Sequence, residues 1–353
     1  MKKSLLALAI LGAIAGSAQA QSSVQIYGNV DAGIIKRTDQ DSSIGKRANN
    51  TLGFKGTEDL GNGLKAIFQL EMRYEPDTGT TETNAAGVQR PLFQGQSRVG
   101  VTGGFGTFRI GRGLTAYQES SIAFEPFHGI PTPQGFQADI HVAGYTSDPL
   151  GLPGNSANRF SNAVFYNSPE YMGFQVNTTI GSRESNGAVA VVGRGTPLLP
   201  QYAANAAALA NPYSISVTYK NGPGALMLAN ERNAVESTVS SFAGYVMIAP
   251  VTKLMFSMTR QDQEHTRILN QNTKAWVVGA NHTIGAGKIL AGIGSKHTDG
   301  LDKVRQYSLG YEYSLSKRTY VYADASKRKG APAVAPSTKT SITTLAVGVN
   351  HSF

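Results

Sequence analysis

The chain has 353 residues, with 40 glycines, 15 tyrosines, no cysteine, 41% apolar residues and 16% charged residues. Without a thiol it can form neither a disulfide framework nor a cysteine-ligated metal or iron–sulfur centre. The formal charge of +9 is modest, and Lys and Arg form no block of the kind that binds nucleic acid. The apolar fraction is too low for a bundle of membrane helices, whereas the abundance of Gly, Tyr, Ser and Thr favours many short strands.

The first twenty residues predict a secretory signal peptide. Lys2 and Lys3 precede an apolar run over residues 5–15, and small residues then lead to Ala20. Cleavage between Ala20 and Gln21 would remove both lysines and leave 333 residues with a formal charge of +7. The alternative is an N-terminal membrane anchor, but the apolar run is shorter than the ~20 residues that cross a bilayer. We therefore expect residues 1–20 to be a signal peptide and residues 21–353 to be the exported domain.

Alternation of apolar and polar residues predicts β-strands throughout the exported domain. In residues 64–73 every even position is apolar, and four of the five odd positions are polar. Similar alternation occurs in residues 24–31, 213–219, 318–327 and 345–353. A soluble sandwich would turn the apolar faces inward, whereas a membrane barrel would turn them toward lipid.

The connections between these strands separate the two cases. Seven short turns are predicted at residues 59–62, 103–106, 168–171, 221–224, 249–250, 285–287 and 315–317. Eight loops, mostly longer and polar, are predicted at about residues 38–47, 77–86, 113–158, 185–212, 234–236, 264–272, 299–302 and 329–339. Short turns at one end and long loops at the other are typical of bacterial outer-membrane barrels. The fold predicted is all-β, a sixteen-stranded antiparallel transmembrane β-barrel.

The C-terminal strand adds a signal for assembly. Leu345, Val347, Val349, His351 and Phe353 share one face, and the chain ends on the aromatic residue. We interpret Phe353 as the assembly signal that the outer-membrane insertion machinery recognises. A soluble edge strand that happens to end in Phe is the alternative.

Four segments carry a family resemblance: residues 23–33, 52–71, 103–112 and 347–353. They resemble the trimeric general diffusion porins of Gram-negative bacteria, most closely the type found in Neisseria, Bordetella and Burkholderia, over essentially the whole exported domain. The resemblance implies a passive, water-filled channel for small hydrophilic solutes and ions. It also implies that three barrels associate through their first few strands and the last one. The loop at residues 77–86 would then reach over the neighbouring subunit.

The longest predicted loop, residues 113–158, follows the fifth strand and is the candidate to fold inward, because a sixteen-stranded barrel is otherwise wide. It contains four acidic residues and no Lys or Arg, and Arg112 and Arg159 flank it. An acidic loop opposite a basic wall would create a transverse field across the narrowest section. We therefore predict Glu119 and Glu125 on the loop side of the constriction, and the resemblance implies Arg112 and Arg159 on its wall.

Alternation also predicts which strand residues line the lumen. They are Lys55, Lys65, Arg73, Arg98, Arg109, Thr51, Gln69 and Glu71. The resemblance implies that Thr51 and Asn29 stand near the constriction at places where the family usually carries arginine and some relatives carry lysine, and that Asn350 takes the place of an arginine of the family ending. These departures temper the modest anion preference that the excess of basic charge predicts.

Aromatic residues are candidates for the girdles at the membrane interfaces, although a few of them could face the lumen instead. They are Tyr27, Tyr166, Tyr311, Tyr313, Tyr320, Tyr322 and Trp276.

Three other functions remain open. A substrate-selective porin would show saturating uptake of one solute, and an adhesin would have a plugged barrel. An outer-membrane enzyme would need a nucleophile and a base, but no GxxxxGK[ST], GxSxG or HExxH motif occurs. His128 and His141 lie thirteen residues apart in the longest loop, which is a weak signal for a metal site, and we predict no metal, no cofactor and no catalysis. The expected partners are outer-membrane lipids and lipopolysaccharide, the assembly machinery, and small solutes and ions.

Overall fold

The computed structural model describes residues 23–83, 89–129, 134–150, 158–183, 208–262, 272–330 and 338–353. The predicted signal peptide, residues 1–20, lies outside these ranges, as do parts of several predicted loops. Within the described ranges, no helix is both long enough and apolar enough to cross a membrane.

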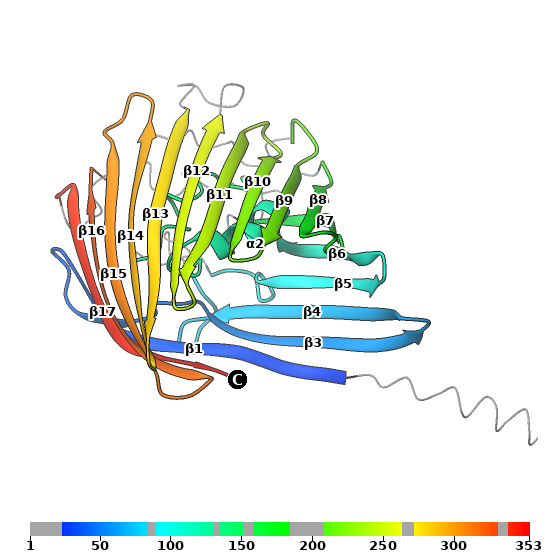
Figure 1. Cartoon of the computed structure of the whole chain (residues 1–353), viewed down its shortest axis with the longest axis horizontal. Coiled ribbons are helices and arrows are strands. Elements are labelled where there is room, and N and C mark those ends of the chain that lie inside the picture. Colours follow the sequence, from blue (N-terminus) through cyan, green and yellow to red (C-terminus); the bar gives the residue numbers. More distant parts are fainter. Residues whose placement is uncertain are drawn as a thin grey trace, which may run out of the picture.

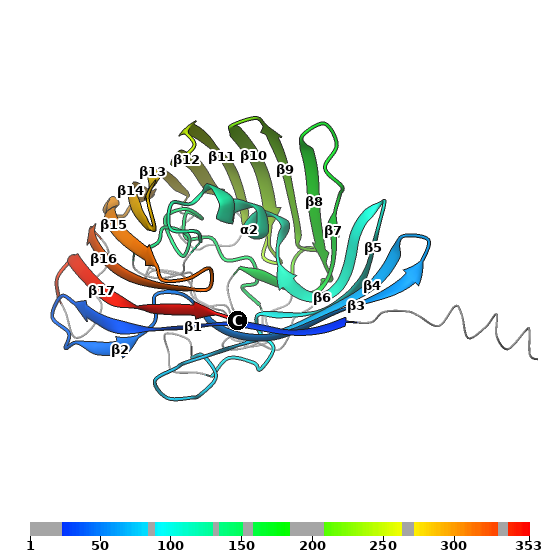
Figure 2. The same cartoon turned by 60° about the horizontal axis from the view of Figure 1, so that its bottom comes forward.

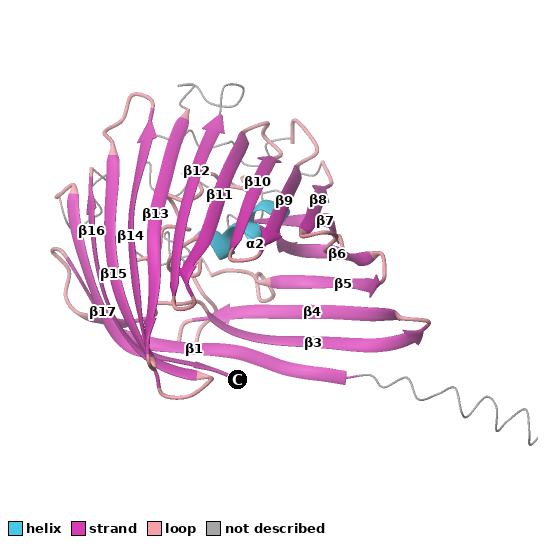
Figure 3. Ribbon diagram, viewed as in Figure 1, coloured by secondary structure: helices cyan, strands magenta, loops and turns pink. Residues whose placement is uncertain are grey.

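Seventeen strands, one α-helix and one short 3-10 helix make up the regular structure of the described residues (Figure 1 and Figure 3). The strands are β1 (Ser23–Arg37), β2 (Ser43–Gly45), β3 (Asn50–Gly61), β4 (Leu64–Tyr74), β5 (Gln96–Gly103), β6 (Gly106–Leu114), β7 (Arg159–Asn167), β8 (Phe174–Gly181), β9 (Tyr213–Asn221), β10 (Gly224–Arg232), β11 (Thr238–Ala249), β12 (Thr252–Asp262), β13 (Thr273–Ile284), β14 (Gly287–Thr298), β15 (Val304–Ser314), β16 (Thr319–Lys329) and β17 (Ser341–Ser352). The helices are α2 (Ala116–Ser121) and η1 (Ile122–Phe124).

Sixteen of the described strands close into an antiparallel barrel. β1 pairs with β3, and each strand from β3 to β16 pairs with the next. β17 then pairs with β1, which leaves no free edge, and β2 is a short extra strand folded back on β1. This confirms the predicted all-β, sixteen-stranded antiparallel fold.

The second loop is longer than predicted. β4 ends at Tyr74 and β5 begins only at Gln96, so the connection covers residues 75–95 instead of 77–86. One reason lies in the sequence after residue 86, where Pro91 has no amide hydrogen for a strand ladder. Its carbonyl accepts a turn hydrogen bond from the Gln94 amide at 3.1 Å.

Side chains alternate between an apolar face and a polar face along the strands. Val278 and Leu309 are 50% and 57% exposed, whereas Ser308 and Asp324 are 6% and 5% exposed. In a closed barrel that exposes its apolar side chains, the apolar face is the outer wall and the polar face lines the interior. Of the aromatic residues predicted for the girdles, Tyr322 instead lies buried on the polar face.

The C-terminal residue closes the barrel against β1. The Gly28 amide donates to the Phe353 carbonyl at 3.2 Å, and the Phe353 amide donates to the Gly28 carbonyl at 3.1 Å. A Cβ on residue 28 would lie 2.4 Å from the Phe353 ring and 2.3 Å from the Thr51 carbonyl oxygen. Only glycine therefore fits where the terminal ring crosses β1.

Hydrogen bonds to the Asp31 side chain join the closing strands to their neighbours. Its buried carboxylate accepts hydrogen bonds from the Arg47 amide at 2.6 Å, the Tyr322 hydroxyl at 2.9 Å and the Asn350 amide group at 2.9 Å. Asn350 thus has a partner on β1. The bonds join β1, β16 and β17 with the chain that leads into β3, and they satisfy a buried charge.

Candidate channel constriction

The segment between β6 and β7 is residues 115–158, and its described parts, residues 115–129 and 134–150, lie against the polar face of the sheet. Its helix α2 contacts β8, β9 and β10, and Figure 2 shows it beside these strands. The amides of Ala116 and Tyr117 donate to the hydroxyls of Thr179 at 3.0 Å and Ser214 at 2.9 Å. Strand hydroxyls therefore satisfy the first amides of the helix, which have no partner within it.

Contacts of the same segment continue across the later strands. The Thr259 hydroxyl of β12 donates to the His141 carbonyl at 2.7 Å. Asp139 forms ion pairs with Lys296 of β14 and Arg328 of β16. Hydrogen bonds and ion pairs thus fix the segment to strands from β8 to β16.

Glu125 organises the turn that follows the helices. Its carboxylate accepts the amides of Phe127 at 2.9 Å, Gly129 at 2.7 Å and Phe136 at 2.9 Å, and the residue is 1% exposed. Burial raises the pKa of Glu125 to about 7, although the three backbone hydrogen bonds act in the opposite direction. In this structure Glu125 points into the loop.

Glu119 on α2 lies opposite two of the predicted wall cations. Its carboxylate is 3.7 Å from the Arg109 guanidinium and 4.0 Å from that of Arg98. Arg98 also donates to the Gln69 side chain at 3.0 Å, and Gln69 donates to the Tyr27 hydroxyl at 2.7 Å. Loop acid and wall cations are therefore brought together at this point.

Tyr27 is a residue of this wall that sequence reasoning placed among the girdle candidates. Its hydroxyl donates to Glu71 at 3.1 Å, and the Lys55 ammonium lies 5.1 Å from its ring centre. The signal that could have placed it is alternation, because Tyr27 shares the odd-numbered face of β1 with Gln25 and Asn29. The predicted lumen residues Lys55, Glu71 and Gln69 thus all contact Tyr27.

Arg112 and Arg159 lie at the two ends of the segment. The Arg112 guanidinium is 3.7 Å from Asp148 and donates to the Ser161 hydroxyl at 2.7 Å. Arg159 is 1% exposed, and its Nε donates to the Gly95 carbonyl at 2.5 Å. Both residues join the segment to the wall, and Arg159 reaches the second loop as well.

The remaining predicted residues divide between the loop end and the turn end of the barrel. Thr51 lies in register between Asn29 on β1 and Arg73 on β4, and the Asn29 amide group donates to the Asn49 carbonyl at 3.2 Å. The positive charge of Arg73 lies close enough to act on the guanidinium groups of Arg112 and Arg159 at the two ends of the segment. Lys65 pairs in register with Asp59 beside the tight turn, so the structure does not bring it to the segment.

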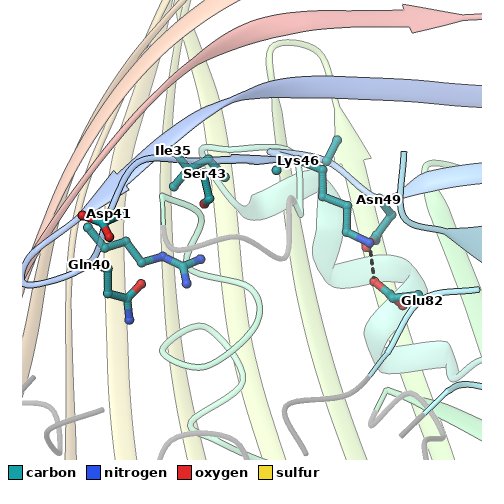
Figure 4. Close-up of a pocket in the computed structure, with 10 residues that line it drawn as sticks. Ile35, Gln40, Asp41, Ser43, Lys46, Asn49 and Glu82 are labelled. Atoms are coloured by element: carbon teal, nitrogen blue, oxygen red, sulfur yellow. Dashed lines mark hydrogen bonds and ion pairs between the residues drawn. The ribbon is translucent and has the colours of Figure 1, made fainter. Parts of the chain in front are cut away.

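A pocket of about 260 Å³ lies where the first and second loops meet, and Figure 4 shows the Lys46 and Glu82 side chains that line it. The Lys46 ammonium is 2.9 Å from both Glu82 and Glu75. Burial alone would raise the pKa of Glu82, but Lys46, Arg73 and Arg90 lower it to about 2. The second loop is therefore tied to its own barrel, while residues 84–86 of the predicted intersubunit loop lie outside the described residues.

Within the described ranges, no three His, Asp or Glu side chains gather as a metal site. Burial lowers the pKa of His141 to about 4, and its Nδ1 lies 3.0 Å from the Ser257 hydroxyl. His141 is therefore a neutral residue packed between the segment and β12.

Comparison with known proteins agrees with this architecture. The family model described as Gram-negative porin matches residues 7–330. The chain is similar to the outer membrane porin protein 32 of Delftia acidovorans, with 31% identity over the whole of both chains, and to an outer membrane porin protein of Bordetella pertussis, with 28% identity over the whole of both. Its fold is similar to that of a solved anion-selective porin from Comamonas acidovorans, with a TM-score of 0.72 and 24% identity, covering 94% of this chain and 100% of that one.

The family match extends over nearly the whole chain, and the closed barrel exposes an apolar outer wall of the kind that faces lipid. These findings confirm the resemblance read from the four sequence segments. They also confirm the predicted outer-membrane location and a channel function without a catalysed reaction. The chain belongs to the Gram-negative porin family, whose members are passive β-barrel channels of the outer membrane.

Proposed function

We propose that residues 115–158 fold into the barrel as its constriction, and that the channel passes small hydrophilic solutes and ions with a modest preference for anions. The contacts of this segment with polar-face side chains from β8 to β16 support an inward path. The solved Comamonas porin of similar fold is named anion-selective, which agrees with the proposed preference.

The proposed anion preference is supported by the balance of charged side chains around Glu119. Arg98 and Arg109 share this one carboxylate. The Lys55 ammonium lies nearby on the Tyr27 ring and forms no ion pair within the described ranges. Glu71, which accepts a hydrogen bond from Tyr27 and also acts on the charge of Arg98, is a second acid of this group. Three cations facing two acids leave one positive charge in excess, which favours anions in the surrounding water modestly.

Arg112 and Arg159 form the second part of the proposed wall cluster. Buried Arg159 and mostly buried Arg112 act on ions through their field and by holding both ends of the segment. Thr51 and Asn29 contribute neutral polar surface beside them. Fewer cations therefore reach water here than in a wall with arginine or lysine at those two positions.

The zero-current potential of single channels in a salt gradient tests this function. Arg98→Gln with Arg109→Gln is expected to move the potential toward cation preference, and Arg112→Glu with Arg159→Glu is expected to move it further. Lys220→Gln, at the exposed turn end of β9, is the matched control. If the arginine variants insert normally and keep the wild-type potential, the constriction lies elsewhere.

The same family membership supports the proposed biogenesis and partners. We propose cleavage after Ala20, recognition of Phe353 by the assembly machinery, homotrimers, and contact of the outer wall with lipid and lipopolysaccharide. The mass of the protein purified from outer membranes tests the cleavage site directly.

A further inference from the structure

The pocket of about 260 Å³ where the first and second loops meet lies on the inner face of the barrel, at the loop end of β1. Two of its lining residues, Ile35 and Arg37, share the odd-numbered face of β1 with Asp31, which is buried on the polar side. Ser43 of β2 lies opposite Ile35 in the register and therefore shares that face. Long loops mark the outer end of such barrels, so a solute that enters from outside meets this pocket before the proposed constriction.

One group of charged side chains in the pocket is already paired. The Lys46 ammonium lies 2.9 Å from both Glu75 and Glu82, and Arg90 lies 3.1 Å from Glu82. Two cations thus face two acids, and their charges largely cancel. This group forms a neutral side of the pocket.

The pocket also has one cation and one acid without such partners. Arg37 and Asp41 both line it, and neither forms an ion pair with any residue that the structure describes. The buried Nε of Arg37 has no hydrogen-bond partner among those residues either. Figure 4 shows Asp41 beside Gln40, away from Lys46 and Glu82. A buried donor without an acceptor is costly, which favours a ligand that accepts from Arg37.

Two opposite charges that line one pocket without meeting select a solute by its own charges. A carboxylate that faces Arg37 gains charge-assisted hydrogen bonds, and an ammonium that faces Asp41 gains them as well. A simple anion would be repelled by Asp41, and a simple cation would be repelled by Arg37. The arrangement therefore favours a solute that carries both charges.

The size and the neutral lining of the pocket limit this solute further. Its volume is below the range of about 300–1,000 Å³ typical of sites for drug-sized ligands, which indicates a smaller molecule. Ile35, only 7% exposed, and Ala48 supply apolar surface. Gln40, Ser43 and Asn49 supply uncharged donors and acceptors. A small zwitterion with a short apolar side chain matches all of these groups.

We infer that this pocket is a weak binding subsite for α-amino acids in the outer vestibule. The carboxylate of the amino acid accepts from Arg37, its ammonium donates to Asp41, and its side chain lies on Ile35. The inference rests on the proposed function, a channel for small hydrophilic solutes, and adds a class of solute that enters as a zwitterion. Weak binding raises the concentration of the solute at the channel entrance and still allows its release toward the constriction.

Saturation-transfer NMR of the purified protein in detergent measures this binding without a current. The three probes are leucine, isocaproate and isopentylamine at pH 7. They share one branched apolar chain and carry both charges, the carboxylate alone or the ammonium alone. Leucine is expected to have the lowest half-saturating concentration of the three, because it alone matches both Arg37 and Asp41.

Two single variants test the roles of the charges. Arg37→Gln should raise the half-saturating concentration of leucine by about tenfold or more, the effect of hydrogen bonds to a charged group. Asp41→Asn should raise it by about threefold, because Asp41 is exposed to water. The preference should change as well: Asp41→Asn should bind isocaproate more tightly than the wild type does, and Arg37→Gln should do the same for isopentylamine.

The chain offers a matched control for each variant. Lys36→Gln removes a cation from the outward, exposed face of β1, one residue from Arg37. Asp302→Asn removes an exposed acid from the loop between β14 and β15. Each control should change the half-saturating concentration of leucine by less than about twofold, because solvent and salt screen both charges from the pocket.

Equal half-saturating concentrations for the three probes would overturn the inference, and so would an equal loss of leucine binding in Arg37→Gln and Lys36→Gln. If Arg37→Gln does not fold, Asp41→Asn still decides, since its expected gain of isocaproate binding requires an intact Arg37. Conductance in potassium chloride separates this inference from the proposed function. A protein that conducts with anion preference but does not favour leucine refutes the subsite alone, whereas one that favours leucine but does not conduct refutes the proposed function alone.

Discussion

Neutralising Glu119 should increase the anion preference of the channel. In Glu119→Gln, Arg98 and Arg109 lose the carboxylate that lies 4.0 and 3.7 Å from them. The shape of the side chain is kept, so the change is close to a pure change of charge. The Glu119 side chain is 35% exposed, as is expected of an acid that permeating ions meet.

The size of the effect follows from the distances. An anion beside the two guanidinium groups would be ~7 Å from the Glu119 carboxylate, where the repulsion in water is about 0.6 kcal/mol before screening. A Debye length of ~10 Å at 0.1 M salt halves this to about 0.3 kcal/mol. Removing the carboxylate lowers the free energy of an anion at this point and raises that of a cation by this amount. The ratio of anion to cation permeability should therefore rise about threefold. At 1 M salt the Debye length is ~3 Å, and the change should nearly vanish.

The assay is the zero-current potential of Glu119→Gln channels in planar bilayers with a potassium chloride gradient, repeated at low and high salt. Glu170→Gln is the matched control, because Glu170 is exposed in the turn between β7 and β8 and forms no ion pair in the described part of the chain. If Glu119→Gln and Glu170→Gln give the same ratio at low salt, Glu119 does not face the ion path. A shift that persists at high salt would refute the electrostatic account instead.

Four further outcomes are expected. The raised pKa of Glu125, about 7 against an ordinary 4.5, means that the native loop binds more protons than the unfolded loop between these values. Hydrogen-exchange protection of the three amides bonded to Glu125 should therefore decline as pH rises from about 4.5 to about 7, and Glu125→Gln should remove this dependence. Asp31→Ala leaves three donors without their acceptor and should lower the free energy of unfolding by about 3 kcal/mol, measured by urea titration in detergent. Phe353→Ala should reduce the amount of folded protein in the outer membrane, and wild-type yield at high expression would contradict its role. Deleting residues 77–86 should lower the temperature at which trimers dissociate, and an unchanged temperature would show that this loop does not join subunits.

The expectation for Glu125 illustrates why the constriction could be predicted only in part. From the sequence, Glu119 and Glu125 are equivalent acids of one loop. Three backbone amides surround the Glu125 carboxylate, whereas two arginines approach that of Glu119. Which acid faces water depends on the path of the loop, and that path is set by contacts with strands far away in the sequence.

Alternation, turn spacing and the terminal phenylalanine were sufficient to predict the barrel and its strand number, and alternation predicts the faces of Lys55, Arg98 and Arg109. These are local properties, because the direction of a strand side chain follows from its parity and a closed sheet needs only turns and loops in sequence. Tertiary structure alone decided that Tyr27 joins the wall and that Arg159 is buried against the second loop. It also decided that Arg37, Asp41 and Glu82 line one pocket. Such groupings depend on cross-strand register and loop path, which no single segment contains.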